Sequence, residues 1–256
     1  MAPHPGSSGG ERARRDRSPA RGDPDRRGAP PRGRRSSGER TTRQLVHLPD
    51  DVVGELKGTA RPGKGDILVQ VFAEAVTAFG DEDMDEAIRL GEQAKHIALR
   101  SGSVREMLGL AYYRNGRFKE AARELSAFRR LAGSTEQNPV LADCYRAMKK
   151  PERAIELCDE MDDSVPEAIR YEGAIVAAGA MADMGRVDEA IARIETLDLD
   201  PPSAADHHLR AWYVLGDLLE RRGRFTQSLN YFEAAAAADA ESTDAPERAR
   251  RLRGRA

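Results

Sequence analysis

The chain has 256 residues, of which 39% are hydrophobic, 33% are charged and only 5% are aromatic. The low aromatic content favours helices packed through small residues and disfavours an all-β architecture, in which aromatic and β-branched residues dominate. The net charge of −2 hides a segregation, because residues 1–43 hold twelve Arg and five acids, residues 247–256 hold five Arg and one Glu, and the remainder holds 24 basic and 37 acidic residues. We therefore expect an acidic body between two basic ends.

Cysteine and histidine usage argues against a disulfide framework and a zinc site. Cys144 and Cys158 have no zinc-ligand spacing, and the five His residues form no ligand cluster in the sequence. No apolar run follows Met1, and the longest weakly polar stretch, residues 174–184, is too short to span a bilayer. These features predict a cytoplasmic protein in a reducing compartment, without a membrane partner.

Residues 1–47 are predicted to be a disordered leader. Between Met1 and Arg43 there is no Val, Ile, Leu, Phe, Tyr or Trp, whereas Arg, Gly, Pro and Ser dominate. Such a segment cannot bury enough apolar surface to offset the entropy lost on ordering its backbone. Its arginines suit RNA binding, but a genome that encodes Arg for most basic residues would give the same composition.

Residues 48–66 are predicted to form a short capping helix and a linker. Pro49 followed by two acidic residues is a good helix start, and the helix should end near Leu56. Residues 58–64 fit the first seven positions of the phosphate-binding loop G-x4-G-K-[ST], but the next residue is Gly65 and no apolar strand precedes the loop. We interpret this segment as a Gly/Pro linker and expect no nucleotide cofactor.

From residue 67 to residue 240 the apolar residues recur with the helical period, which predicts successive helices joined by short turns. A two-helix unit repeats five times in this region, and intervals of 34, 33, 36 and 38 residues separate the copies of one slot. That slot is held by Ala87, Ala121, Ala154, Ala190 and Ser228. A period near 34 residues is typical of stacked-helix solenoids, which usually bind other molecules. We expect residues 241–256 to be a basic C-terminal tail.

The unit resembles the tetratricopeptide repeat, whose pattern is W-x2-L-G-x2-Y followed by Ala, Phe and Pro. The last copy shows the pattern most clearly, with Trp212, Leu215, Gly216, Phe225 and Phe232. The resemblance implies an all-α fold, a right-handed α-solenoid of about five helix-turn-helix repeats.

Glycines are expected where a helix ends or where two helices approach closely. Gly116, Gly185 and Gly223 fall at the end of the first helix of a repeat, where a left-handed residue can terminate it. Gly216 on a first helix is expected to face Ser228 on the second, so that the two backbones come close together.

The chain is also similar, at a finer level, to a group of actinobacterial tetratricopeptide repeat proteins that have an Arg/Gly/Pro-rich leader. The likeness lies in residues 104–133, VREMLGLAYYRNGRFKEAARELSAFRRLAG, and in residues 143–155, DCYRAMKKPERAI. It implies a cytoplasmic protein and adds no known catalytic activity.

The family's partner-binding groove is lined by the inner face of the first helices, and the resemblance transfers thirteen residues to it. They are Glu106, Tyr113, Arg114, Glu136, Asp143, Arg146, Glu172, Asp183, Arg210, Tyr213, Asp217, Glu220 and Arg221. Seven are acids and four are arginines, so the expected partner is a basic protein or peptide. The two tyrosines are the best candidates, since exposed aromatic groups supply contact area at low entropic cost.

Some family members grip a terminal carboxylate of a peptide with a Lys/Asn set. The corresponding slots here hold Phe72, Val76, Glu106 and Leu110, which disfavours that mode of binding.

No motif provides catalytic residues at the spacing that a reaction requires. His207 and His208 are adjacent, so on a helix their side chains diverge by about 100°, and no third ligand is near in sequence. Cys158 occupies a core slot, and Cys144 has no partner base. We therefore expect a protein that is not an enzyme and has no cofactor, metal or small-molecule substrate.

Two functions remain open from the sequence. The leading hypothesis is a scaffold or adaptor that binds a partner segment in the groove. The alternative is an RNA- or ribosome-associated factor tethered by the Arg-rich leader, whose lack of aromatic residues predicts weak sequence preference.

Overall fold

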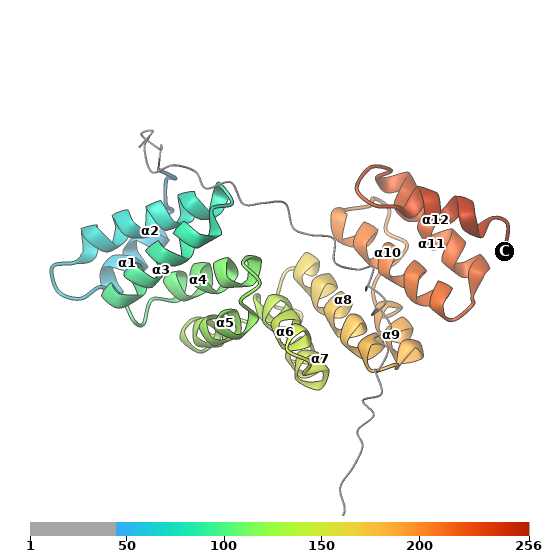
Figure 1. The fold of residues 1–256 in the computed structure, drawn as a ribbon, viewed down its shortest axis with the longest axis horizontal. Coiled ribbons are helices and arrows are strands. Elements are labelled where there is room, and N and C mark those ends of the chain that lie inside the picture. The colour runs from blue at the N-terminus through green and yellow to red at the C-terminus, as the bar shows by residue number, and fades with distance from the viewer. Residues whose placement is uncertain (1–44, 256) are drawn as a thin grey trace, which may run out of the picture. The chain divides into compact units, whose positions relative to one another are not determined.

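The computed structural model describes residues 45–255, so the predicted leader up to residue 44 lies outside the described residues. The chain divides into two units, Met1–Arg43 and Gln44–Ala256, and the helices belong to the second. Residues 45–255 form twelve α-helices and no strand, which confirms the all-α class (Figure 1). None of these helices is both long and apolar enough to cross a bilayer.

The helices follow one another along the chain with short connections. They are α1 (Asp50–Thr59), α2 (Gly65–Gly80), α3 (Met84–Ile97), α4 (Gly102–Arg114), α5 (Phe118–Ala132), α6 (Asn138–Ala147), α7 (Pro151–Asp159), α8 (Glu167–Asp183), α9 (Val187–Ile194), α10 (Asp206–Arg221), α11 (Phe225–Ala238) and α12 (Ala245–Leu252).

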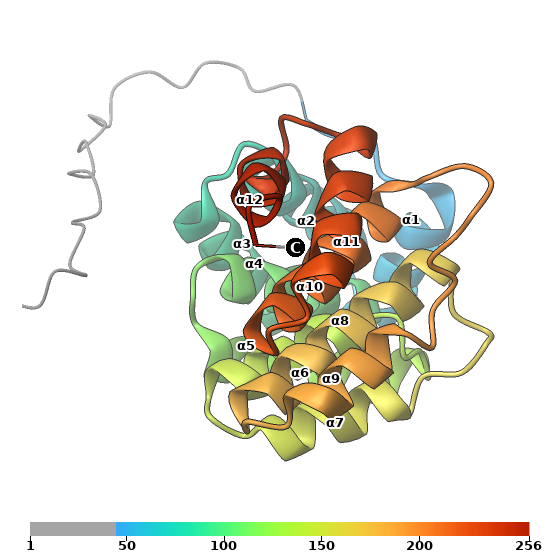
Figure 2. The ribbon, with the colours of Figure 1, turned by 90° about the vertical axis from the view of Figure 1, so that its right-hand side faces the viewer.

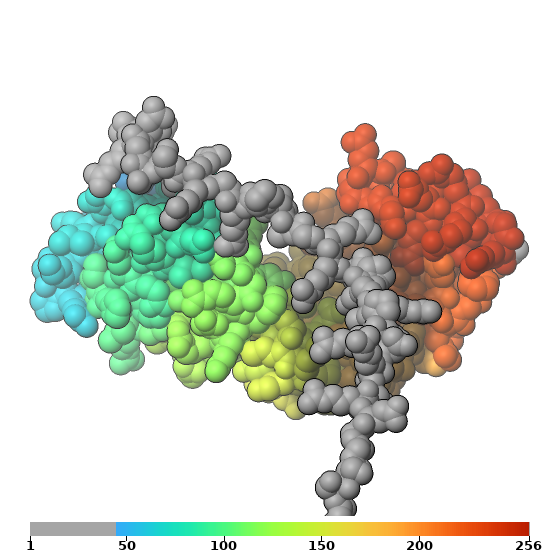
Figure 3. Space-filling view, in the orientation of Figure 1, coloured from blue at the N-terminus to red at the C-terminus, as the bar shows by residue number. Residues whose placement is uncertain are grey.

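Helices α2 to α11 form five hairpins, each packing a first helix against the second helix that follows it. First helices of consecutive hairpins also touch, as α6 touches α8 and α8 touches α10, so they form one layer. Figure 2 looks along the stack, with α10 and α11 in front of α8 and α9. Within residues 45–255 every extensive contact joins helices close in the chain, and the colours in Figure 3 therefore follow in order. This is the architecture of a helical-repeat solenoid.

The repeated small residue lies in the packed interior of each hairpin. The slot is fully buried in all five copies, namely Ala87, Ala121, Ala154, Ala190 and Ser228. In the last repeat the Ser228 hydroxyl donates to the Gly216 carbonyl at 2.7 Å, and a Cβ on Gly216 would lie 3.1 Å from the Phe232 ring. In the second repeat a Cβ on Gly109 would lie 2.7 Å from the Leu125 side chain. Larger residues would push the two helices apart.

In all five repeats the turn inside the hairpin has a residue with a left-handed backbone conformation at the same place. Gly116, Gly185 and Gly223 have φ values of 75°, 78° and 72°, which confirms the prediction. Glu82 (φ 60°) and Lys149 (φ 62°) occupy the same place in the first and third repeats. In every repeat the next N–H donates to the carbonyl five residues earlier at 2.9 Å, the bond of a Schellman motif.

The fold includes residues that the sequence analysis assigned to the leader. The predicted leader extends to residue 47, yet the Val46 N–H donates to the Thr77 hydroxyl of α2 at 3.1 Å. Helix α1 then runs to Thr59 rather than to Leu56, and Pro49 stands at its N-cap.

The predicted basic tail contains a helix, α12, and this corrects the sequence interpretation of residues 241–256. Ala245, Ala249 and Leu252 are buried in one cluster with Phe232 and Trp212 of the last repeat. The buried positions recur every three or four residues, which is the helical period. The arginines between them obscured this signal in the composition.

Candidate functional site

The predicted groove residues, here called the inner face, lie on the first helices α4, α6, α8 and α10, with Glu136 in the turn before α6. Their polar groups connect neighbouring repeats. The Tyr113 hydroxyl donates to Asp143 at 2.8 Å, and Arg146 donates from Nε to Asp183 at 2.6 Å. These contacts make the inner face a ladder of paired groups rather than a row of free charges.

Arg146 is the best-defined member of this ladder. Its hydrogen bond to Asp183 raises the pKa of the guanidinium, and Asp143 lies on its other side at 3.4 Å. A Cβ on Gly179 would lie 2.9 Å from the guanidinium carbon, so this glycine of α8 leaves room for the arginine. Gly179 was missed by the sequence reasoning, although a glycine in a helix interior is a usable sign of a close neighbour.

The same pairing continues to the next repeat. Arg210 of α10 lies 2.5 Å from Glu172 of α8, and the two residues are 38 positions apart in the chain. An acid and an arginine of the predicted set therefore neutralise each other.

Glu106 and Glu136 are the exception on the inner face. Among residues 45–255, no cationic side chain lies within ion-pairing distance of either carboxylate; Glu106 accepts only a hydrogen bond from the Gln137 amide at 2.8 Å. Burial raises the pKa of Glu106, and the nearby charge of Glu136 raises it further. The uncompensated negative charge of the inner face therefore lies at the junction of the second and third repeats.

The inner face of the last repeat is occupied by α12. Arg248 donates to Asp217 at 2.8 Å and to Glu220 at 2.7 Å, while Arg251 donates to Glu220 at 2.8 Å. Burial alone would raise the pKa of Glu220, but these hydrogen bonds hold it below its ordinary value. Arg221 forms an ion pair with the other carboxylate oxygen of Asp217 at 2.7 Å. These acidic residues are thus already paired within the chain.

The two remaining predicted residues, Arg114 and Tyr213, also have partners. The Tyr213 hydroxyl donates to Asp244 at 2.7 Å, and the Arg114 guanidinium lies 4.8 Å from the centre of the Phe79 ring. Tyr113 and Tyr213 are both partly buried with their hydroxyls bonded, so neither is the exposed aromatic group that the sequence reasoning expected. Burial and the acceptor carboxylate raise the pKa of both phenols.

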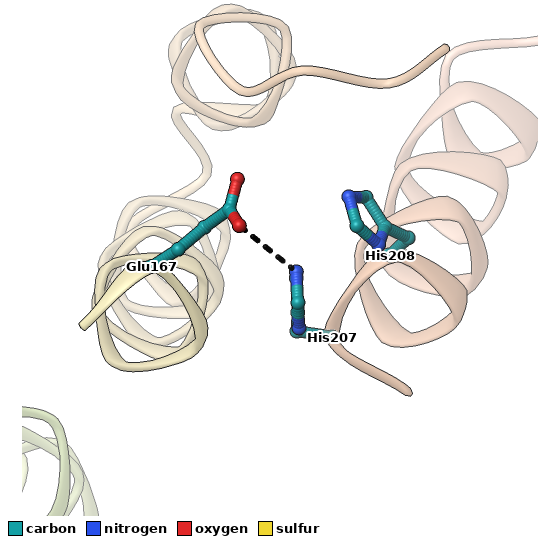
Figure 4. A group of neighbouring side chains, drawn as sticks. All are labelled: Glu167, His207 and His208. Atoms are coloured by element: carbon teal, nitrogen blue, oxygen red, sulfur yellow. Dashed lines mark ion pairs between the residues drawn. The ribbon is translucent and has the colours of Figure 1, made fainter. Parts of the chain in front are cut away.

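A cluster of Glu167, His207 and His208 brings together three groups that could ligate a metal (Figure 4). Glu167 comes from the first turn of α8, and its carboxylate lies 3.9 Å from His207 Nε2. The sequence reasoning found no third ligand because this one is 40 residues away.

The chemistry of the histidine pair does not suit a metal. His208 Nδ1 accepts the Ala205 N–H at 3.0 Å, so the neutral ring carries its proton on Nε2 and has no free lone pair. Burial lowers the pKa of His207, and His208 lowers it further. One histidine and one carboxylate remain, fewer than the three or four protein ligands of known zinc sites. The geometry instead gives His208 a capping role at the start of α10.

The two cysteines are core residues. Cys144 and Cys158 are buried, and burial raises the pKa of both thiols to about 12. The reactive form of a cysteine is the thiolate, so neither side chain is activated as a nucleophile.

Five stacked hairpins with a common small-residue slot and a common turn define an α-solenoid, a class of protein that presents an extended surface to partners. The family model of the tetratricopeptide repeat matches residues 106–169, 177–243 and 213–256. These matches cover more than half of the chain, and the chain belongs to the tetratricopeptide repeat family. Proteins of this family bind protein or peptide partners and are typically non-catalytic.

Solved structures show the same fold at low sequence identity. A putative kinesin light chain with nearly identical TPR-like repeats, from Podosopora anserina, is 19% identical, with coverage of 69% of this chain and 96% of that chain and a TM-score of 0.55. A thermophilic TPR protein of Thermus thermophilus is 16% identical, with coverage of 72% and 98% and a TM-score of 0.54. YrrB, a TPR protein with an unusual peptide-binding site, is 15% identical, with coverage of 69% and 89% and a TM-score of 0.50. No curated protein matches the chain.

Proposed function

We propose that this protein is a non-catalytic scaffold or adaptor that binds a basic segment of a partner protein along the inner face. The observation that carries the proposal is the pair Glu106 and Glu136, which has no cation beside it in residues 45–255. A carboxylate whose pKa is raised by burial and by a second carboxylate gains from an added cation. A lysine or arginine of a partner would supply that charge.

Helix α12 supports the same preference from within the chain. It is rich in arginine, and Arg248 and Arg251 fill the acidic positions of the last repeat. The inner face thus already holds one basic helix by carboxylate–guanidinium pairs. The peptide-binding site of YrrB, a protein of the same fold, is in keeping with a peptide ligand.

The test is binding of a fluorescein-labelled peptide with two arginines spaced three residues apart, followed by anisotropy. Replacing both acids, Glu106→Gln with Glu136→Gln, should weaken binding by about tenfold, or about 1.4 kcal/mol, for the loss of two charge-assisted contacts. The matched control is Glu152→Gln with Glu189→Gln, two exposed acids on α7 and α9 that change the net charge equally. Equal losses in both double variants would reject the assignment.

Tyr213 and Asp217 are unsuitable for this test even though they belong to the predicted set. Their partners are Asp244 and Arg248, so substitutions there would detach α12 and change the fold of the last repeat. Within residues 45–255, Glu106 and Glu136 hold no neighbouring helix by an ion pair, which makes their removal a cleaner measurement.

The RNA- or ribosome-associated role is the second candidate, and it rests on the twelve arginines of residues 1–43. Removing residues 1–43 should abolish co-purification of RNA if the leader neutralises phosphates. The same deletion should raise affinity for the basic peptide at low salt if the leader competes for the acidic body. RNA retained by the shortened chain would contradict the first expectation, and an unchanged peptide affinity the second.

A further inference from the structure

A second cleft lies where α5 meets α6 and α7, and none of the thirteen inner-face residues lines it. Its volume is about 400 Å³, and Leu141 and Leu157 are among its lining residues, with exposures of only 2% and 1%. Arg129 and Arg130 from the last turn of α5, together with Arg153 from α7, also line it. The cleft therefore combines buried apolar side chains with three guanidinium groups.

The rim of this cleft is held in place by the turn between α5 and α6. Gly133 ends α5 with φ 65°, and the buried Asn138 at the start of α6 donates from its amide to the Leu157 carbonyl at 2.7 Å. The Asn138 N–H also donates to the Thr135 carbonyl at 2.9 Å, and the Ser134 hydroxyl accepts the Glu136 N–H at 3.2 Å. A rim bonded in this way needs little ordering when a ligand binds.

The cleft has more positive charge than its acidic neighbours compensate. Arg129 donates to Glu160, and Arg153 Nη1 lies 3.5 Å from the same carboxylate and 2.7 Å from Glu156. For Arg130, no acidic partner lies within ion-pairing distance in residues 45–255. Glu160 shows that a carboxylate fits beside these guanidinium groups, and Arg130 remains available for a second anion.

We infer that this cleft binds an acidic segment of a partner protein, with a carboxylate or phosphoryl group at Arg130 and Arg153 and an adjacent apolar side chain against the partly exposed Tyr145 ring. Both anionic groups accept the paired N–H donors of a guanidinium. A peptide fits better than a nucleic acid, because Tyr145 is the one aromatic residue that lines the cleft and successive bases need a stacking surface.

This inference is independent of the proposed function, since the cleft uses other residues and prefers the opposite charge. The probes are three fluorescein-labelled peptides, Ala-Leu-X-Leu-Ala, in which X is glutamate, phosphoserine or glutamine. The acidic peptides should bind the full chain and the glutamine peptide should not. Arg130→Gln with Arg153→Gln should weaken the binding of the acidic peptides at least tenfold.

Matched controls come from the other hairpins. Arg186 and Arg224 are likewise exposed, with side-chain exposures of 40% and 45%, so Arg186→Gln with Arg224→Gln removes the same charge elsewhere. This control should change affinity by less than twofold. Glu160→Gln should strengthen binding severalfold because it removes the internal competitor, whereas Glu189→Gln should not.

The outcomes separate the possibilities. Tighter binding of the phosphoserine peptide assigns a phosphoryl ligand, and equal binding of the two acidic peptides assigns a carboxylate; both support the cleft. Failure of both acidic peptides to bind, or equal losses in the cleft and control variants, overturns it. A twelve-nucleotide single-stranded RNA is also offered as a competitor. If it displaces the peptide, and if this displacement requires Arg130 and Arg153, the choice of a peptide ligand is overturned. Glu106→Gln with Glu136→Gln should leave acidic-peptide binding unchanged, and equal thermal unfolding of all variants checks their folding.

Discussion

The left-handed turn residue allows one chemical change, Gly→Ala, to be tested with opposite expected signs. Gly223 has φ 72° in the turn between α10 and α11, whereas Gly54 lies inside α1 with an ordinary helical backbone. At both positions an added Cβ would meet no heavy atom within 4 Å beyond the adjacent residues and, for Gly54, the backbone of its own helix. The methyl group therefore gains no packing contact with the rest of the described fold, and the main difference is the backbone preference.

The magnitudes follow from that preference. A left-handed alanine costs about 1–2 kcal/mol, and the reduced freedom of the unfolded chain returns about 0.4–1 kcal/mol. The difference between the two mid-range values predicts that Gly223→Ala destabilises the fold by about 0.8 kcal/mol. Gly54→Ala should stabilise by about 0.5–1 kcal/mol. Lys149 is exposed and has φ 62°, a left-handed backbone conformation that is unfavourable for a residue with a Cβ. Lys149→Gly should therefore stabilise the fold by about 0.5–1 kcal/mol.

Urea unfolding followed by circular dichroism and by the fluorescence of the single tryptophan measures these differences. Trp212 lies in the same repeat as Gly223, so its signal reports that substitution directly, and circular dichroism covers Lys149 and Gly54. The two signals are compared because repeat arrays can unfold in parts. The reasoning is wrong if Gly223→Ala leaves the urea midpoint unchanged, or if Gly54→Ala and Gly223→Ala shift it in the same direction.

Three other predictions follow from the burial and charge of particular groups. The pKa of Glu106 is higher in the folded than in the unfolded chain, so ionisation of this carboxyl lowers stability as the pH rises through the unfolded-state pKa and then the folded-state pKa. Glu106→Gln should therefore unfold at a higher urea concentration than the parent at pH 7. The difference should vanish below about pH 4, where the carboxyl is protonated in both states. A variant less stable than the parent at pH 7 would contradict this sign. Cys144 and Cys158, with pKa values of about 12, should react with a thiol reagent at pH 8 only after denaturation, and rapid labelling of the native chain would disprove their burial. Ending the chain after residue 240 removes α12, which should shift Trp212 emission to longer wavelength because the helix packs in the same cluster. The stability of the last repeat should fall by about 2–5 kcal/mol, for the loss of a buried aliphatic side chain of the size of Leu252. Unchanged emission would show that α12 does not pack against this core.

The repeat frame could be predicted because it depends on contacts within one hairpin. The buried slot that Ala121 and Ser228 share and the left-handed turns at Gly116 and Gly223 are local requirements, and few residue types meet them. Lys149 shows the limit, because a turn with the same geometry carried no glycine to signal it.

Which charged groups of the inner face pair with each other could not be predicted in the same way. Whether Glu172 is free or meets Arg210 depends on the rotation between neighbouring hairpins, which a periodic pattern does not contain. The same holds for Glu167 and His207, which come from different repeats. Helix α12 was hidden for another reason, since Ala245 and Ala249 give a weak apolar signal among many arginines.

The distribution of unpaired charge limits where a partner can bind. Within residues 45–255, Arg248 pairs with the acids of the last repeat, and Arg146 and Arg210 pair with those of the third and fourth. Glu106 and Glu136 are the inner-face acids in this part of the chain that have no cation beside them. The turn of residues 133–137 contributes Glu136 to the inner face and the rim residues Ser134 and Thr135 to the cleft where α5 meets α6 and α7. A partner that carried a basic and an acidic segment would meet both sites at one hairpin junction. Its second contact would then form within the complex, at a high effective concentration, and loss of either site would weaken binding by more than that site's own affinity suggests.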